Sequence, residues 1–86
     1  MRSDVGEKRL LYTEKEGQYL AFIFYYKKIN GVSPAQIDFQ RYFAVSPPTV
    51  HNMILRLEKK NLIHRTPNSP RSLTINLDEC ELPKLQ

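Results

Sequence analysis

Hydrophobic residues recur with a helical period in the first patterned stretch of the chain. Thr13 and Glu16 have the spacing of a capping box, which predicts the start of a long helix. The helix should end near Ile29, because Asn30-Gly31 supplies a C-terminal cap that tolerates positive φ. One side of the helix is apolar and should face the core. That predicted core face contains Tyr19, Leu20, Ile23, Tyr26 and the stem of Lys27.

Two shorter helical patterns follow. Ser33 predicts the cap of a second helix that begins with Pro34 and runs to about Phe43, with Phe39 and Phe43 as its buried pair. Ser46 predicts the cap of a third helix, whose first turn tolerates the prolines at 47 and 48. The predicted buried positions of this third helix are Val50, Met53, Ile54 and Leu57.

After Asn61 the hydrophobic period changes from helical to alternating. Residues 62–66 and 72–77 are predicted strands, and residues 67–71 form a turn-rich link between them. Three helices followed by a hairpin predict a mainly α fold with a small β-hairpin, the three-helix winged helix-turn-helix.

The length of 86 residues allows one small domain. We expect a flexible N-terminal arm over residues 1–11, the winged helix-turn-helix domain over residues 12–77, and an acidic tail or linker over residues 78–86. The longest apolar run, residues 20–26, is too short for a membrane span, and the N-terminus lacks the apolar core of a signal peptide. These features predict a cytoplasmic protein without a membrane partner.

Positive charge gathers in the middle of the chain. Residues 39–76 carry six basic side chains and one acidic side chain, a net charge of +5. The whole chain has a net charge of +4, so the positive charge lies in this middle stretch. A basic middle is typical of a protein that binds a polyanion, although a solvated surface has the same composition.

Three segments together resemble the DNA-binding domain of the LexA repressor family. They are Val45-Ser-Pro-Pro-Thr-Val-His51, Leu57-Glu-Lys-Lys-Asn-Leu-Ile-His-Arg-Thr-Pro67 and Pro70-Arg-Ser-Leu73. The resemblance covers roughly residues 12–77 and implies a winged helix that contacts duplex DNA through its third helix. It also implies that bases are contacted by Ser46, Pro48, Thr49, His51 and Asn52.

The chain departs from the family pattern at two turns and at its end. Ala44 stands where many such turns have glycine, and Asn61 where the family often has glycine before the wing. Asparagine tolerates the left-handed conformation, and alanine does so less well. LexA repressors also carry a self-cleaving peptidase domain that dimerises them. This sequence stops before such a domain, so self-cleavage is not expected of it.

Several polar side chains suit contacts with DNA. Asn52 can bond adenine in bidentate fashion, and Arg56 can reach guanine or a phosphate. Phosphate contacts are expected from Arg41, Lys59 and Lys60. The predicted wing contacts, to the backbone or the minor groove, are Arg65, Asn68, Ser69 and Arg71. The alternative for Asn52 and Arg56 is a solvated helix face. The alternative for the wing residues is an exposed turn that contacts nothing.

No metal, cofactor, small-molecule ligand or catalytic group is expected. His51, His64 and Cys80 match no zinc-binding spacing and lack a fourth ligand. Ser46 is explained as a helix cap, so pairing it with a lysine as a catalytic dyad has no support. The sequence therefore predicts that the protein is not an enzyme.

An aromatic surface on the first helix remains unassigned. Phe24 and Tyr25 are predicted to point away from the core, next to Ala21 and Lys28. This surface could mediate a homodimer or bind another protein, or the chain's own ends could cover it.

The function predicted from sequence is a sequence-specific, duplex-DNA-binding transcriptional regulator, a repressor by family analogy. The alternative is a winged helix used as a protein–protein interaction module through the aromatic surface. A DNA-binding fragment of a longer regulator is compatible with the first hypothesis.

Overall fold

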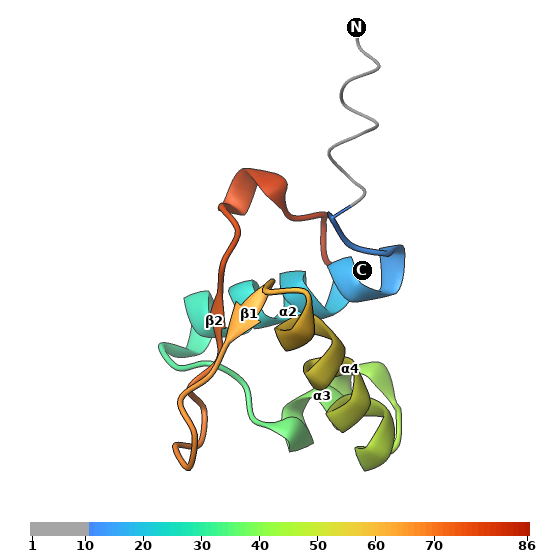
Figure 1. The fold of residues 1–86 in the computed structure, drawn as a ribbon, viewed down its shortest axis with the longest axis vertical. Coiled ribbons are helices and arrows are strands. Elements are labelled where there is room, and N and C mark those ends of the chain that lie inside the picture. Colours follow the sequence, from blue (N-terminus) through green and yellow to red (C-terminus); the bar gives the residue numbers. More distant parts are fainter. Residues whose placement is uncertain (1–10) are drawn as a thin grey trace, which may run out of the picture.

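Within residues 11–86, three helices are followed by a short antiparallel hairpin and a C-terminal 3-10 turn (Figure 1). The computed structural model describes residues 11–86, so most of the predicted N-terminal arm lies outside the described residues. The elements are α2 (Glu14–Asn30), α3 (Gln36–Phe43), α4 (Pro47–Lys59), β1 (Ile63–His64), β2 (Thr74–Ile75) and η2 (Glu79–Glu81). The predicted winged helix-turn-helix fold is confirmed.

Local hydrogen bonds fix the two ends of α2. The Thr13 hydroxyl accepts from the Glu16 amide at 3.2 Å, and the Thr13 amide donates to the Glu16 carboxylate at 2.8 Å, as the capping-box spacing predicts. Gly31 ends the helix at φ 81° and donates to the carbonyl of Lys27.

The start of α3 differs from its prediction. Ala35, not Ser33, is the N-terminal cap residue, and the Asp38 carboxylate accepts from its amide at 2.8 Å. The hydroxyl of Ser33 instead accepts from the amide of Leu73 on the hairpin at 3.1 Å. A tertiary contact therefore uses the side chain that the local pattern assigned to a cap.

The turn between α3 and α4 depends on a left-handed residue. Ala44 ends α3 at φ 55°, a conformation that is unfavourable for any residue with a Cβ atom. Ser46 then caps α4 by accepting from the Thr49 amide, with prolines in the first two helical positions. The helix-turn-helix predicted here is confirmed.

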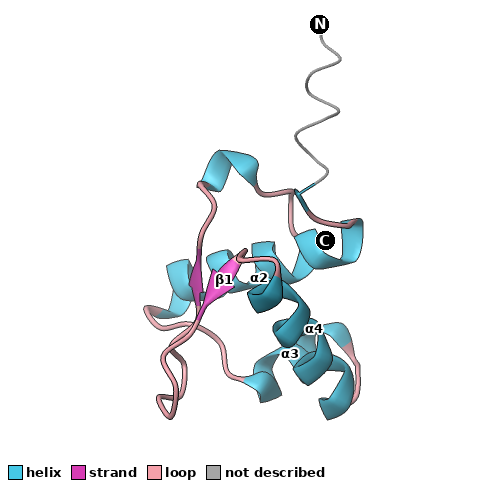
Figure 2. Cartoon of the chain, viewed as in Figure 1, coloured by secondary structure: helices cyan, strands magenta, loops and turns pink. Residues whose placement is uncertain are grey.

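The hairpin, which we call the wing (residues 63–75), has shorter strands than predicted. Its two short strands are drawn in magenta in Figure 2. Two residue pairs match across them, Ile63 with Ile75 and His64 with Thr74. Its outer part is held by side chains instead, because the Ser72 hydroxyl accepts from the Thr66 amide at 3.0 Å and donates to the Thr66 carbonyl at 3.2 Å.

The core joins α2 to α3, α4 and the two strands. The predicted stripe of α4 is buried, as are Tyr19, Leu20 and Ile23 of α2. Phe22 is also buried, although it lies off the predicted core face, because it packs on the aromatic rings of α3. Lys27 is exposed rather than covered. In residues 11–86, no helix is both long and apolar enough to cross a bilayer.

The C-terminal segment, residues 78–86, packs against the start of α2 (Figure 1). Tyr12 donates a hydrogen bond to the carbonyl of Glu81, and the Gln18 side chain bonds the backbone of Lys84 and of Gln86 at 2.9 Å each. Gly17 permits this contact, since a Cβ there would lie 2.7 Å from the Tyr12 ring and 3.1 Å from Pro83.

Candidate nucleic-acid interface

The face of α4 opposite its buried stripe is exposed. All six residues predicted to contact bases lie on or beside this surface, from the cap at Ser46 to Arg56. Val50, Met53, Ile54 and Leu57 are at most 6% exposed on the other side of the helix. The helix is therefore fixed by one face and free to contact a partner with the other. The exposed set is Ser46, Pro48, Thr49, His51, Asn52 and Arg56.

The hydroxyls at the start of α4 are bonded to each other. Ser46 and Thr49 share a hydrogen bond of 2.9 Å between their side-chain oxygens, in addition to the cap. Each hydroxyl still has capacity for a further partner on its exposed side.

Arg56 of α4 and Lys60, the residue that caps its C-terminus, bind the same buried carboxylate. Arg56 Nη2 lies 2.9 Å from Glu16 Oε2, and Lys60 Nζ lies 2.8 Å from Glu16 Oε1. The Glu16 side chain is 0% exposed, whereas those of Arg56 and Lys60 are 55% and 43% exposed. We call these three residues the α4 clamp, because they tie the end of α4 to the start of α2.

The clamp keeps Glu16 ionised. Burial alone would raise the pKa of Glu16, but the hydrogen bonds from Lys60 and Thr13 and the charges of Lys60 and Arg56 outweigh burial and lower it. Arg56 was predicted as a base contact and Lys60 as a phosphate contact. In the structure both are internal ion-pair partners whose side chains remain partly exposed.

A second ion pair joins the end of α4 to the wing. Arg65 Nε donates to Glu58 Oε2 at 2.9 Å. Beside this pair lies a hollow of about 590 Å³, lined by Glu58, Arg65 and residues 66–70. Asn68 and Ser69 are exposed in that loop, and Asn68 has a positive φ of 62°.

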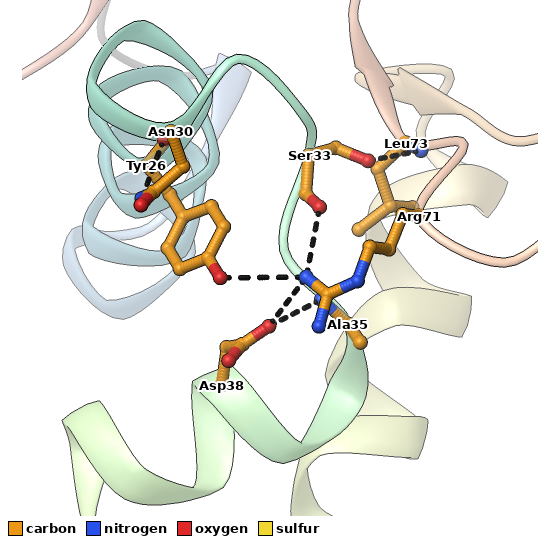
Figure 3. A network of polar contacts seen from close by, with 7 residues as sticks. All are labelled: Tyr26, Asn30, Ser33, Ala35, Asp38, Arg71 and Leu73. Carbon is orange, nitrogen blue, oxygen red and sulfur yellow. Dashed lines mark hydrogen bonds and ion pairs between the residues drawn. The ribbon is translucent and has the colours of Figure 1, made fainter.

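Arg71 turns inward toward α2 and α3 (Figure 3). Its Nη1 atom lies 3.0 Å from Asp38 Oδ2, 3.3 Å from the Tyr26 hydroxyl and 3.4 Å from the Ser33 carbonyl. We call these four residues the wing bracket. Burial alone would raise the pKa of Asp38, but the Ala35 amide and Arg71 outweigh it and lower that pKa.

Two of the predicted phosphate contacts have no ion-pair partner among residues 11–86. Arg41 on α3 and Lys59 on α4 are both exposed. They differ in this respect from the other four cations of the basic middle, each of which pairs with an acid of the chain. The paired set is Arg56, Lys60, Arg65 and Arg71.

The sequence did not identify the acids that organise this surface. Glu16 was recognised only as part of a capping box, and Asp38 was not singled out. Their partners lie between 33 and 44 residues away in the chain, so no local spacing reveals the pairing.

The aromatic surface on α2 needs one correction. Ala21 is 0% exposed and cannot belong to it. Phe24 and Tyr25 are partly buried and pack edge to face with centroids 5.0 Å apart, while Lys28 Nζ lies 5.7 Å above the Phe24 ring. Phe24 and Lys28 also line a groove of about 450 Å³ between α2 and β2.

The histidines and the cysteine lie on separate elements: His51 on α4, His64 on β1 and Cys80 in η2. Within residues 11–86, no three His, Cys, Asp or Glu side chains gather where they could hold a metal ion.

Comparison with known proteins points to two groups of regulators. Residues 30–70, from the end of α2 into the wing, match the MarR family. A LexA repressor of Thermosipho melanesiensis is 38% identical over 63 residues, which cover 73% of this chain and 32% of that repressor. The LexA repressor of Clostridium perfringens is 38% identical over 64 residues, with the same coverage.

A LexA repressor of Exiguobacterium sibiricum is 33% identical over 70 residues, or 80% of this chain and 34% of that protein. The chain thus spans about a third of the length of the curated relatives it matches.

Proposed function

Because the chain is a LexA-like winged helix-turn-helix domain, we propose that it is a transcriptional regulator, acting as a repressor, that binds duplex DNA in a sequence-specific manner. One observation carries this proposal: α4 buries one face completely and leaves the opposite, polar face exposed. The relatives named as LexA repressors support the regulatory role.

The dimensions of α4 suit the major groove. Its 13 residues span about 20 Å, and the groove is about 12 Å wide, enough to admit a helix. Asn52 is exposed about one and a half turns from the N-terminus of α4, where an amide can bond both N6 and N7 of adenine. Ser46, Thr49 and His51 provide further hydrogen-bonding groups at the same end.

Phosphates are bound by the cations that have no ion-pair partner within residues 11–86. Arg41 and Lys59 serve this role directly, while Arg56 and Lys60 add charge from the exposed part of the α4 clamp. The wing loop, through Arg65, Asn68 and Ser69, lies against the backbone or the minor groove.

The test combines selection of duplexes from a random pool with fluorescence anisotropy over a salt series. We expect an enriched motif and an affinity that falls as salt rises. Asn52→Ala should weaken binding to the selected duplex by about fivefold to a hundredfold and relax the preference for one base pair. Lys84→Ala, a charge removed from the C-terminal segment, is the matched control and should leave binding unchanged.

Absence of binding at low salt would overturn the proposal. The groove between α2 and β2 that Phe24 lines would then be the place to search for a protein partner. A palindromic motif would indicate that two copies bind together, and light scattering across protein concentrations would check for the homodimer.

A further inference from the structure

We infer that Arg71 is a positioning residue: it fixes the wing to α2 and α3 through Asp38, so that an acid of α3 sets where the wing meets DNA. This inference rests on the proposed DNA binding. It assigns Arg71 a different role from the direct DNA contact expected from the sequence.

The first support is the set of partners of one guanidinium nitrogen. Arg71 Nη1 is within 3.4 Å of acceptors on Tyr26, Ser33 and Asp38, which belong to α2, the α2–α3 link and α3 (Figure 3). Asp38 is itself held by the amide of Ala35 at 2.8 Å, so it is a fixed anchor.

The second support is the backbone of the wing. Arg71 has φ 55°, a left-handed conformation that residues with a Cβ atom seldom adopt. Glycine would satisfy this backbone without strain. The presence of arginine therefore indicates that its side chain contributes something at this position, and the three contacts show what it binds.

The third support is the continuity of these contacts. Arg71, Ser72 and Leu73 are consecutive; Arg71 and Leu73 tie the wing to the rest of the domain, and Ser72 ties its two sides together. Ser72 closes the loop onto Thr66, and the Leu73 amide donates to Ser33 Oγ at 3.1 Å. Because β1 and β2 have only two residues each, these contacts determine the direction of the wing loop.

The charge of Arg71 is already matched inside the protein. If its guanidinium moved to a phosphate, the Asp38 carboxylate, which is 13% exposed, would lose its cation close to the polyanion. Lys59 has no such competing partner in the described part of the chain. The two cations should therefore respond differently to mutation.

The experiment compares Arg71→Ala, Arg71→Gly and Asp38→Asn with Lys59→Ala, using the selected duplex and a random-sequence duplex over a salt series. A positioning role predicts that all three bracket variants bind the selected duplex about threefold to thirtyfold more weakly. Their slopes of log affinity against log salt should equal that of the wild type. Lys59→Ala should lower the magnitude of that slope by about 0.9, since it removes one phosphate contact.

The double variant Arg71→Ala with Asp38→Asn should bind no more weakly than either single variant, because both break the same link. Arg71→Gly separates the effect of losing the side chain from the effect of disturbing the backbone. Glycine keeps the left-handed turn but cannot make the contacts of the wing bracket. Amide exchange without DNA provides a further readout: the Leu73 amide should exchange faster in the three variants, while amides of α4 keep their protection.

A slope lowered by about 0.9 in Arg71→Ala, together with unchanged or tighter binding by Asp38→Asn, would overturn the inference and assign Arg71 to a phosphate. Unchanged Leu73 exchange would overturn it as well. If the wild type binds neither duplex, the proposed function fails, and the exchange measurement still decides whether Arg71 holds the wing.

Discussion

Helix α4 and the wing are the two elements proposed to meet DNA, and they are attached to the domain in different ways. Four apolar side chains of α4 are buried, and the clamp on Glu16 adds to them. The base of the wing buries Ile63 and Leu73, but its strands have only two residues each, and polar contacts through Ser33, Asp38 and Ser72 hold the rest. Because its apolar side chains form part of the core, α4 cannot move without a large loss of folding free energy. The wing loop is held by polar contacts, so a change in its direction should cost less.

The largest effect on stability is expected from removing a buried side chain of α4. Leu57→Ala removes a side chain that is 0% exposed and should lower the free energy of unfolding by about 2–5 kcal/mol. Urea denaturation measures this change. Leu55→Ala, on the exposed side of the same helix, is the control and should change stability by less than about 0.5 kcal/mol. Equal losses in the two variants would contradict the one-sided burial of α4.

The α4 clamp should have the next largest effect. Glu16→Gln removes the carboxylate that Arg56 and Lys60 share, and we expect a loss of about 1–3 kcal/mol. The loss is limited because both cations are partly exposed and can regain water.

The pH dependence of stability tests the same residue. The pKa of Glu16 is lowered in the folded state, so the unfolded chain takes up the proton more readily. Its contribution is present in full above the unfolded value of about 4.3 and is lost as pH falls through the folded value. The stability difference between wild type and Glu16→Gln should therefore shrink on acidification; a constant difference would exclude this role.

Removing the hydrogen bond between the wing and Ser33 should lower the free energy of unfolding by less and affect mainly the wing. Ser33→Ala leaves the Leu73 amide without an acceptor in a buried place and should cost about 1–2 kcal/mol. Amide exchange should increase in the wing before it increases in α4. Ser69→Ala, at the exposed tip of the loop, is the control. Equal opening of the wing and of α4 would mean that they unfold as one unit.

The smallest effect concerns the turn that precedes α4. Ala44→Gly relieves a left-handed alanine and should raise the free energy of unfolding by about 0.5 kcal/mol after the entropy of the unfolded chain is counted. Ala35→Gly, at an extended φ of −93°, should instead lower stability by up to about 1 kcal/mol. Thermal unfolding of both variants tests the difference in sign.

The sequence predicted the features that depend on neighbours in the chain. The caps at Thr13 and Ser46, the apolar stripe of α4 and the suitability of Asn61 for a left-handed turn all arise within a few residues. The exposed face of α4 followed from the same stripe. Such features are fixed by local hydrogen bonds and helical periodicity.

The features that were missed depend on residues far away in the chain. Serine is a common helix cap, but the hydroxyl of Ser33 accepts a hydrogen bond from the amide of Leu73 instead. Arg56 and Arg71 looked like free cations because Glu16 and Asp38 lie 40 and 33 residues earlier. Phe22 escaped the single-face analysis because α2 is covered by α3 as well as by α4 and the wing.

The folded-back C-terminal segment also offers an optical reporter. Cys80, the only cysteine in the sequence, is exposed in η2, which lies at the opposite end of the molecule from the wing loop (Figure 1). A single thiol-reactive dye can thus be attached away from the proposed DNA surface. Its emission would follow whether residues 78–86 stay on the start of α2 when duplex is added, in the same titration that measures affinity.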